Sequence, residues 1–363
     1  MVRKLLQRLL SEWVIKAANK YSSRPDLTRV HDALTTLYNK INIEPGKRGV
    51  VLDIDQNSKV IIFSDQHKGS RNDADDFALS ESTYLTALAY YNDNKFVYCS
   101  LGDSEELWKN QLLGVLKHNK KTFDAEKEFL KRKAFIKVFG NHDLYWDNDP
   151  LAGFNLEKIY GEKVRIYEGA ILKYKVKSAD LTIFLTHGHQ GDLQSDGNWF
   201  SKWFVSNIWA PFQSYLKINP NTPAFDNQLK SAHNSIMYSW TAKQSDLVLI
   251  TGHTHQPVFN SLTHLERVYI RLDEAKKSGD KATVQKFEAE LLAGKISGET
   301  SPRIEASKNT YFNTGCCCYS DGDITGIEIQ NGKIRLVKWK TSTNLPARIV
   351  LEEGLLENLI DVK

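Results

Sequence analysis

Apolar residues in this chain gather in short runs that are separated by polar and helical stretches. The clearest runs are Val60 to Phe63, Phe96 to Leu101, Ala134 to Phe139, Leu181 to Leu185 and Leu247 to Ile250. Short apolar runs of this kind are typical of buried strands. Helical patterns lie between them, at about 74–92, where acidic residues load the first turns, and at about 122–133. Alternation of strands and helices predicts an α/β layered architecture.

The ends of the chain and two internal regions depart from this alternation. Residues 1–48 predict an N-terminal helical appendage that Pro25 breaks into two pieces. A main domain is expected over 49–345, with an aromatic helical insertion at 192–243 and a charged helical insertion at 264–306. Apolar runs at 311–313, 324–329 and 334–339, with turn residues between the last two, predict a β-meander. Residues 346–363 are expected to be a C-terminal tail.

The aromatic insertion carries four of the eight tryptophans of the chain. Two interpretations remain open from the sequence. The segment is either a helical subdomain with its own core, or an apolar lid beside a ligand pocket, since such pockets are largely apolar and aromatic.

Composition narrows the class of protein. With 41% hydrophobic residues the chain can build a core, and 48 basic against 44 acidic residues argue against a dedicated nucleic-acid surface. Cys99 and the run Cys316-Cys317-Cys318 fit no disulfide framework, so we expect packed thiols and a cytoplasmic location. The basic amphipathic helix near the N-terminus either docks onto the globular body or makes peripheral contact with the inner face of a membrane.

Each of the five apolar runs is followed by side chains that commonly bind metals. These segments are Asp65-Gln66-His67, Gly102-Asp103, Gly140-Asn141-His142-Asp143, His187-Gly188-His189 and Gly252-His253-Thr254-His255. Their mixed oxygen and nitrogen donors suit Mn, Fe or Zn better than Ca. One such fragment alone is a weak signal, but all five in this order predict a metalloenzyme.

Spacing within the segments suggests how ions are shared. Asp65 and His67 lie two residues apart at a strand exit, so both side chains can turn toward one ion. Asp103 follows a glycine, which lets the backbone approach closely enough for its carboxylate to bridge two ions. The other candidate ligands are Asn141, His187, His253 and His255.

The ordered set Asp-x-His, Gly-Asp, Gly-Asn-His-Asp, His and Gly-His-x-His resembles the calcineurin-like metallophosphoesterase family over about 60–260. The resemblance implies a four-layer α/β/β/α sandwich of two mixed sheets, with the meander after 310 in the second sheet. It also implies two divalent ions, with Mn first and Fe, Zn or Mg as alternatives. One ion would be held by Asp65, His67, Asp103 and His255, and the other by Asp103, Asn141, His187 and His253.

Part of the chain is similar to one branch of that family, the bacterial UDP-diacylglucosamine pyrophosphatases. The similar segments are Gly102 to Trp108, which matches Gly-Asp-x-x-Glu-x-Trp, and Gly252 to Pro257. The aromatic insertion is also similar to the one that caps a lipid substrate in those enzymes. This chain has His142 where they have Arg, and His189 where they have Asp.

The resemblance implies that a hydroxide held between the two ions attacks phosphorus in line with the leaving group. His142 lies next to Asn141 but outside the implied ligand set, so it is expected to donate a hydrogen bond or proton at the leaving oxygen. Asp143 is expected to orient the imidazole of His142. Glu106 is either a partner behind a ligand or the polar start of a helix, and His189 is a further candidate for substrate contact.

These features predict a metal-dependent phosphoester hydrolase. Its expected substrate is a phosphodiester or diphosphate, a small molecule or a lipid-linked phosphate with an apolar portion. The alternatives are a phosphomonoesterase, a nucleotide or nucleic-acid phosphodiesterase, and a catalytically silent binding scaffold. The complete ligand set argues against the scaffold.

Overall fold

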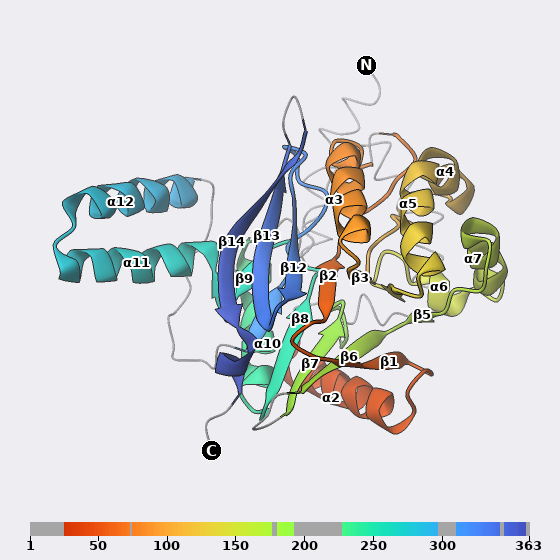
Figure 1. Cartoon of the computed structure of the whole chain (residues 1–363), viewed down its shortest axis with the longest axis horizontal. Coiled ribbons are helices and arrows are strands. Elements are labelled where there is room, and N and C mark those ends of the chain that lie inside the picture. Colours follow the sequence, from red (N-terminus) through yellow and green to blue (C-terminus); the bar gives the residue numbers. More distant parts are fainter. Residues whose placement is uncertain are drawn as a thin grey trace, which may run out of the picture.

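Two mixed sheets form the centre of the molecule, as seen in a computed structural model that describes residues 25–72, 75–175, 180–191, 227–296, 310–341 and 345–360 (Figure 1). The first sheet contains, in spatial order, β1 Gly49–Ile54, β6 Gly169–Lys175, β7 Asp180–Thr186, β8 Leu247–Thr251, β11 Tyr311–Asn313, β9 Val258–Phe259 and β10 Leu262–Thr263. The second contains β14 Ala347–Leu355, β13 Lys333–Lys340, β12 Ile324–Gln330, β2 Lys59–Phe63, β3 Val97–Leu101, β4 Phe135–Val138 and β5 Ile166–Tyr167.

The two sheets face each other across the largest hydrophobic core. Strand β2 shows how the sequence builds this arrangement, because its side chains alternate between the two faces of the sheet. Val60 and Ile62 join Leu172 and Ile183 of the first sheet in the core between the sheets. Each of these side chains is at most 1% exposed.

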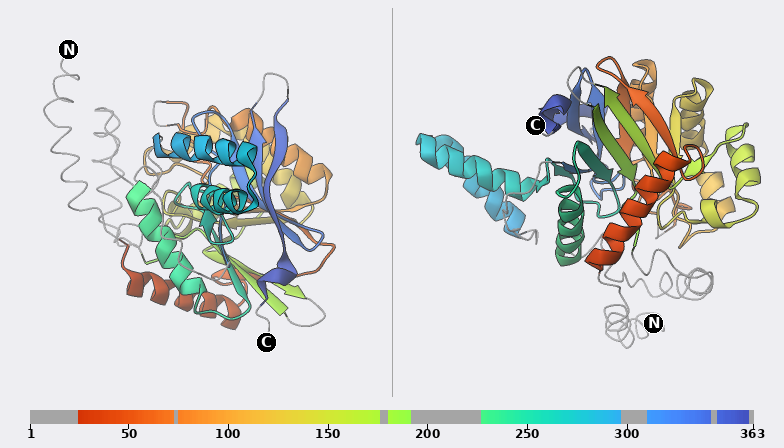
Figure 2. Two further views of the ribbon diagram at one scale, coloured as in Figure 1. Left: turned by 90° about the vertical axis from the view of Figure 1, so that its left-hand side faces the viewer. Right: turned by 90° about the horizontal axis from the view of Figure 1, so that it is seen from below.

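Helices cover the outer faces of both sheets. The helices in sequence order are α2 Leu27–Ile43, α3 Glu81–Asp93, α4 Leu112–His118, α5 Lys120–Lys131, α6 Tyr145–Asn148, α7 Ala152–Tyr160, α10 Asn227–Thr241, α11 His264–Ser278 and α12 Lys281–Ile296. On the second sheet, Ile61 and Phe63 pack against Tyr84 and Leu88 of α3. Helices α2 and α10 cover the face of the first sheet that points away from the second sheet (Figure 2). The resulting order of layers is α/β/β/α.

All five strands expected before the metal-ligand segments are confirmed. They are β2, β3, β4, β7 and β8, and their bounds differ from the expected runs by at most two residues at either end. In the second sheet β2, β3 and β4 run parallel to one another, and in the first sheet β7 runs parallel to β8. Parallel neighbours end at the same edge of a sheet, so the loops that follow these strands emerge together.

The expected three-stranded meander is wrong in one respect. Strand β11 does not join β12 and β13 but runs parallel to β8 in the first sheet. Only β12 and β13 form the expected antiparallel pair, and β12 pairs with β2. The sequence between 313 and 324 therefore crosses from one sheet to the other, because the short run Tyr311–Asn313 finds its hydrogen-bonding partner on the edge of β8.

Two predicted boundaries also need correction. Residues 346–363 are not simply a tail, because β14 pairs along its whole length with β13 and the 3₁₀ helix Leu356–Leu359 buries Leu356 against the core. Residues 1–48 are not simply an appendage, because α2 buries Leu34 and Ile41 against the first sheet. In both segments apolar side chains at regular spacing find a partner that is distant in sequence.

The helix expected over 74–92 begins only at Glu81. Asp75, one of the acidic residues that suggested an earlier start of the helix, stabilises the preceding loop instead. Asp75 accepts the backbone N–H groups of Arg71 at 2.7 Å and Phe77 at 3.1 Å. A carboxylate that caps turns in this way competes with helix formation.

Helices α11 and α12 form a hairpin that projects from the body of the molecule (Figure 1). Its small core consists of Leu265, Val268, Leu272 and Leu291. At its base, the Glu352 carboxylate of β14 binds Arg267 at 3.0 Å and Arg271 at 2.7 Å. This hairpin lies within the range predicted as a charged helical insertion.

Of the aromatic insertion, only α10 and the residues after it lie in the described part of the chain. Trp240 of α10 is 2% exposed, packs against Phe184 and donates its indole N–H to Thr35 of α2. This tryptophan belongs to the core between α10, α2 and the first sheet. Residues 192–226, which carry the other three tryptophans of the segment, lie outside the described residues, as do residues 1–24, where the N-terminal helix is predicted.

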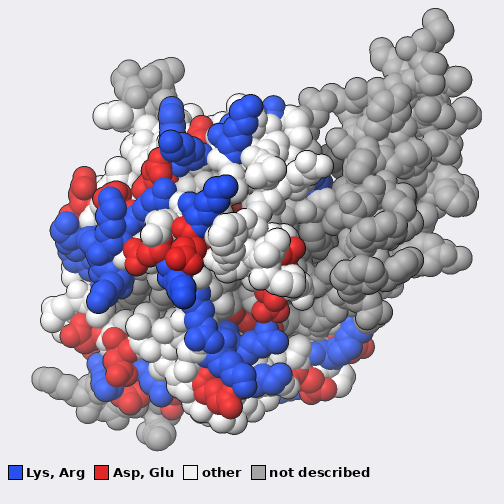
Figure 3. Space-filling view, turned by 90° about the vertical axis from the view of Figure 1, so that its right-hand side faces the viewer, with Lys and Arg blue, Asp and Glu red and all other residues white. Residues whose placement is uncertain are grey.

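Charged side chains of both signs intermix on the face of the molecule shown in Figure 3. Helix α5 carries two exposed pairs, Lys127 with Asp124 at 2.8 Å and Lys131 with Glu128 at 2.6 Å. Among the helices that the structure describes, none is long and apolar enough to cross a bilayer.

Candidate metal centre

The predicted metal-ligand segments converge at one edge of the two sheets. Five of their residues have a left-handed backbone, with φ between 50° and 69°: Asp65, His67, Asp103, His253 and His255. Side chains other than glycine rarely adopt this conformation, which costs about 1–3 kcal/mol per residue. Backbone hydrogen bonds hold the loops in place, including His67 N–H to the Asp103 carbonyl at 2.9 Å. The chain therefore accepts local strain where these side chains turn inward.

Asp103 lies at the centre of this arrangement. Its Oδ1 accepts the backbone N–H of His142 at 2.7 Å, which fixes the carboxylate. Its Oδ2 lies 3.1 Å from His187 Nε2 and 3.8 Å from His67 Nε2. Asp103 forms one group of candidate ligand atoms with His67 and His142 and a second with His187 and His253, each group spanning no more than 4.8 Å. One carboxylate therefore faces both sides of the site.

The first candidate ion position lies between Asp65, His67 and His255. Asp65 Oδ1 is 3.2 Å from His255 Nε2 and 3.8 Å from His67 Nε2. The two Nε2 atoms are themselves 3.1 Å apart. Three donor atoms this close to one another match the spacing of ligands around one divalent ion, where each metal–ligand bond is about 2.0–2.2 Å.

The second ion position lies between Asp103, Asn141, His187 and His253. Asn141 Oδ1, His187 Nε2 and His253 Nε2 are buried and form no hydrogen bond of acceptable geometry. Leaving a buried polar atom without a partner costs about 1–3 kcal/mol. Because all three atoms are metal donors, a divalent ion satisfies them. The residues present therefore fit an ion at this position.

Two glycines make the close approach of these loops feasible. Gly102 has φ +87°, and a Cβ there would lie 2.5 Å from His187 Nδ1. At Gly140 a Cβ would overlap the Asp103 carboxylate. Any larger side chain at either position would displace a candidate ligand.

His187 shows how the backbone selects a tautomer. Its Nδ1 lies 2.9 Å from the Leu101 carbonyl, which can only accept a hydrogen bond. Nδ1 therefore carries the proton, and the lone pair is left on Nε2. That atom is the one that lies beside Asp103.

The carboxylates and the burial of the site act in opposite directions on its histidines. Burial alone would lower the pKa of His187, but Asp103 and Asp65 outweigh it and raise the pKa to about 9. Burial alone would also lower the pKa of His255, but Cys316 and Asp65 outweigh it and raise the pKa to about 9. The pKa of His253 is lowered by burial and by the neighbouring imidazoles of His233 and His187. Acidic side chains on both sides of the site therefore favour the binding of cations.

Glu106 is a buried partner of two histidines. Its Oε2 lies 2.9 Å from His142 Nδ1 and 3.2 Å from His67 Nδ1. The indole ring of Trp108 stacks on the His142 ring at 4.2 Å between centroids with an angle of 21° between the planes. Through these contacts the Glu-x-Trp segment holds the His142 imidazole, and Glu106 also contacts His67.

The predicted role of Asp143 is not what the structure shows. Its carboxylate accepts backbone N–H groups, from Gly140 at 2.6 Å, Ser104 at 2.8 Å and Asp103 at 3.3 Å. Asp143 therefore ties the loop after β4 to the loop after β3. The His142 ring is oriented instead by Glu106. Because Glu106 is distant from His142 in the sequence, this contact could not be predicted from neighbouring residues.

His189 and His233 lie on the side of the second ion. His189 is 2% exposed, and its ring centroid is 5.5 Å from that of His187. His233 of α10 is also 2% exposed, with its ring centroid 5.2 Å from that of His253. His233 was not predicted from the sequence as a site residue, because it lies within helix α10 and not at the end of a strand.

A buried network of ion pairs lies beneath the site. Lys68 Nζ is 2.6 Å from Glu126 and 3.2 Å from Glu105, and Lys137 Nζ is 2.9 Å from Glu105. All four side chains are at most 1% exposed. Because Lys68, Glu105 and Lys137 come from three successive strands or the loops after them, the network fixes these loops relative to one another.

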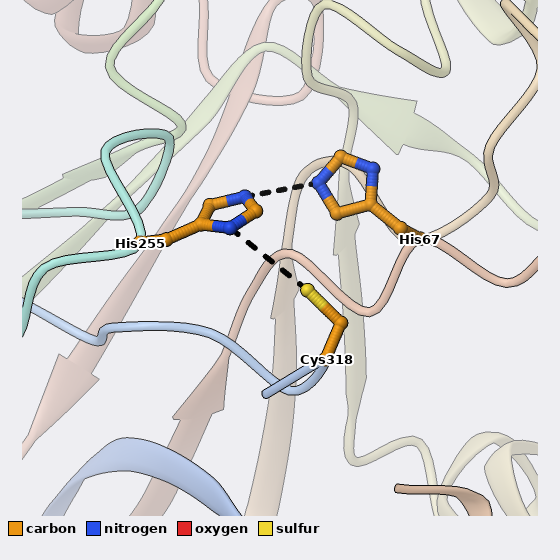
Figure 4. Close-up of side chains that lie close together, drawn as sticks. All are labelled: His67, His255 and Cys318. Atoms are coloured by element: carbon orange, nitrogen blue, oxygen red, sulfur yellow. Dashed lines mark hydrogen bonds between the residues drawn. The ribbon is translucent and has the colours of Figure 1, made fainter. Parts of the chain in front are cut away.

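The run of three cysteines, expected only to be packed thiols, also lies at the site. Residues 316–318 lie between β11 and β12, where the chain crosses between the sheets. Cys318 Sγ is 3.9 Å from His255 Nδ1 (Figure 4). Cys318 also forms a group of candidate ligand atoms with His67 and His255. No spacing in the sequence signals this contact.

A family model agrees with the fold and the site. The family model of calcineurin-like phosphoesterases matches residues 58–257. This chain belongs to the calcineurin-like phosphoesterase family, and its two mixed sheets with outer helices are the metallophosphoesterase sandwich. Membership indicates metal-dependent phosphoester hydrolysis, and the groups of candidate ligands agree with binding of divalent metal.

Among solved structures, the chain is similar to that of a single mutant of Vps29 from Entamoeba histolytica. The sequence identity is 14% and the TM-score 0.28, over 81% of this chain and 99% of the other. A search of curated protein sequences found no match.

Proposed function

We propose that this protein is a hydrolase of phosphoesters that uses two divalent ions, with Mn as the expected metal. One observation carries the proposal: the Asp103 carboxylate belongs to ligand groups on both sides of the site. A shared carboxylate is what a pair of ions about 3.5–4 Å apart requires. Neither a single-ion site nor a structural zinc site needs it.

The chain's own residues would hold the ions in two sets. The first set is Asp65, His67, Asp103 and His255, and the second is Asp103, Asn141, His187 and His253. When bound, two such ions supply an activated water and neutralise charge on the phosphoryl oxygens. The protein's part is to keep the donor atoms fixed, through the left-handed loops and the Leu101 contact that orients His187.

We assign the proton donor at the leaving oxygen to His142. Its side chain is about 13% exposed, whereas the candidate ligand His187 is fully buried, so His142 can meet a substrate. Glu106 accepts from Nδ1, which leaves Nε2 to face the site. Stacking on Trp108 limits rotation of the ring. A general acid held in this way typically contributes about 10²–10⁴-fold to the rate.

For the substrate class we favour a phosphodiester or diphosphate with an apolar portion. Support comes from the segment Gly102 to Trp108, which is similar to that of the UDP-diacylglucosamine pyrophosphatases and here provides both partners of His142. His142 itself replaces the arginine of those enzymes. An imidazole can give up a proton to a leaving oxygen, whereas a guanidinium keeps its proton.

A hydrolysis screen tests the proposal. Purified full-length protein with added Mn²⁺ would be assayed on bis-p-nitrophenyl phosphate, p-nitrophenyl phosphate, cyclic nucleotides, nucleotide-sugar diphosphates and their acylated forms. We expect turnover of diesters or diphosphates that is abolished by chelation and by Asp103→Asn. Preference for the acylated forms would support the apolar portion, and preference for the monoester would overturn the substrate class. If the purified protein binds no metal and hydrolyses none of these compounds, the proposed function is wrong, and the alternative of a catalytically silent binding scaffold is supported.

A further inference from the structure

The imidazole of His255 has different partners on its two sides. Its Nε2 lies 3.2 Å from Asp65 Oδ1 and 3.1 Å from His67 Nε2, at the first ion position. Its Nδ1 points the other way, toward Cys318 Sγ at 3.9 Å (Figure 4). The sulfur therefore contacts the ring nitrogen that faces away from the first ion position.

A histidine that binds a metal through one nitrogen almost always donates the N–H of the other nitrogen to an acceptor. The structure provides such an acceptor for two other candidate ligands. His187 donates to the Leu101 carbonyl, and His67 Nδ1 lies beside the Glu106 carboxylate. For His255 the corresponding atom is a cysteine sulfur.

We propose that Cys318 is a positioning residue for the first ion: its Sγ accepts the Nδ1–H of His255 and holds Nε2 toward Asp65 and His67. This inference rests on the proposed two-ion centre. It gives one member of the cysteine run a task that neither the family nor the ligand pattern assigns. Loss of the contact would free the ring to rotate and would weaken the first ion more than the second.

Of the two neighbouring cysteines, Cys317 serves as a control and Cys316 is a competing partner of His255. Cys317 is buried, its Sγ lies 3.9 Å from the Thr325 carbonyl, and it belongs to the core beneath α3. Cys316 is buried and also interacts with His255. Cys318 alone of the four cysteines is partly exposed. Its sulfur can therefore be replaced with little disturbance of the core.

Titration with Co²⁺ tests the proposal, because the visible absorption of Co²⁺ reports on each ion without any need for turnover. Chelator-treated full-length protein would be compared with Cys318→Ala, Cys318→Ser, Cys316→Ala and Cys317→Ala. In Cys318→Ala we expect one of the two bound ions to be held about tenfold to a hundredfold more weakly, with the other unchanged. Cys318→Ser should recover most of the loss since its hydroxyl also accepts a hydrogen bond, and Cys317→Ala should match the unsubstituted protein.

Three results would overturn the role of Cys318. They are equal affinities in Cys318→Ala and the unsubstituted protein, a loss seen in Cys316→Ala instead, and a sulfur-to-cobalt charge-transfer band that marks Cys318 as a direct ligand. If Cys318→Ala does not fold, Cys318→Ser and Cys318→Val make the same comparison between a side chain that accepts and one that does not. Failure of the unsubstituted protein to bind two Co²⁺ ions would count against the two-ion centre and not against Cys318 in particular.

Discussion

The Glu106 carboxylate, which is fully buried, lies 2.9 Å from Nδ1 of His142. The same carboxylate oxygen is 3.2 Å from Nδ1 of His67. One buried acid thus orients a candidate ligand and the proposed proton donor together. A change at Glu106 should therefore affect ion binding and turnover at once.

Replacement of Glu106 by glutamine tests this coupling. Glutamine keeps the size of the side chain but removes the charge that both imidazoles face. We expect kcat on a diester substrate to fall about tenfold to a hundredfold, the range typical for loss of a partner behind a metal ligand. Affinity for one ion should fall as well, as measured by metal titration. Glu128→Gln, at an exposed pair on α5, is the matched control, and equal kcat in the two variants would contradict the role of Glu106.

Replacement of His142 by alanine separates chemistry from ion binding. His142 lies outside the proposed ligand sets, so the variant should bind two ions per chain, as measured by elemental analysis. Turnover should fall about 10²–10⁴-fold, because the leaving oxygen loses its proton donor. Normal turnover with two bound ions would refute the assignment.

Replacement of Asp103 by asparagine should weaken both ions, since its carboxylate is the shared one. Ions that bind only the folded state raise its stability by RT ln(1 + [L]/Kd), about 2.7 kcal/mol at a hundredfold excess over Kd. Chelation should therefore lower the Tm of the unsubstituted protein and leave that of Asp103→Asn almost unchanged. Asp124→Asn on the surface of α5 should behave like the unsubstituted protein. A full response to chelation in Asp103→Asn would count against the shared ligand.

Replacement of Asp143 by asparagine should act mainly on stability. The carboxylate accepts N–H groups from two loops, and asparagine supplies one acceptor oxygen where Gly140 and Ser104 bind two. We expect the free energy of unfolding to fall by about 1–3 kcal/mol. Urea unfolding of chelator-treated protein measures this without a contribution from ions. An unchanged unfolding midpoint, with lower kcat alone, would instead support a direct role in orienting His142.

Replacement of Lys68 by methionine should be among the most damaging changes outside the ion site. It leaves Glu105 with one basic partner and Glu126 without its 2.6 Å contact, both in a buried environment. Removing one partner of a buried pair typically costs about 3–5 kcal/mol. Lys127→Met, at an exposed pair, should cost less than about 1 kcal/mol by the same urea assay. Similar midpoints for the two variants would argue against a structural role of the network.

Much of the framework follows from the sequence alone. The strands β2, β3, β4, β7 and β8 were predictable because an apolar run followed by polar ligand residues marks both the strand and its end. The segment 313–324 was not, since pairing of β11 with β8 depends on a partner 60 residues away. Strand β14 was missed for a related reason: its apolar residues Ile349, Val350 and Leu351 are exposed rather than buried in the core, and pairing with β13 gives the segment its structure.

What the sequence determined by itself is the kind of chemistry, since the identity and order of donors such as Asp65, Asp103 and His253 limit the site to divalent ions. Only the tertiary structure decided which side chains contact and orient the imidazoles at the site. Glu106 rather than Asp143 holds His142, and Cys318 lies behind His255. The physical reason is that donor type belongs to each residue, whereas hydrogen-bond partners are set by loops that meet only when both sheets are assembled.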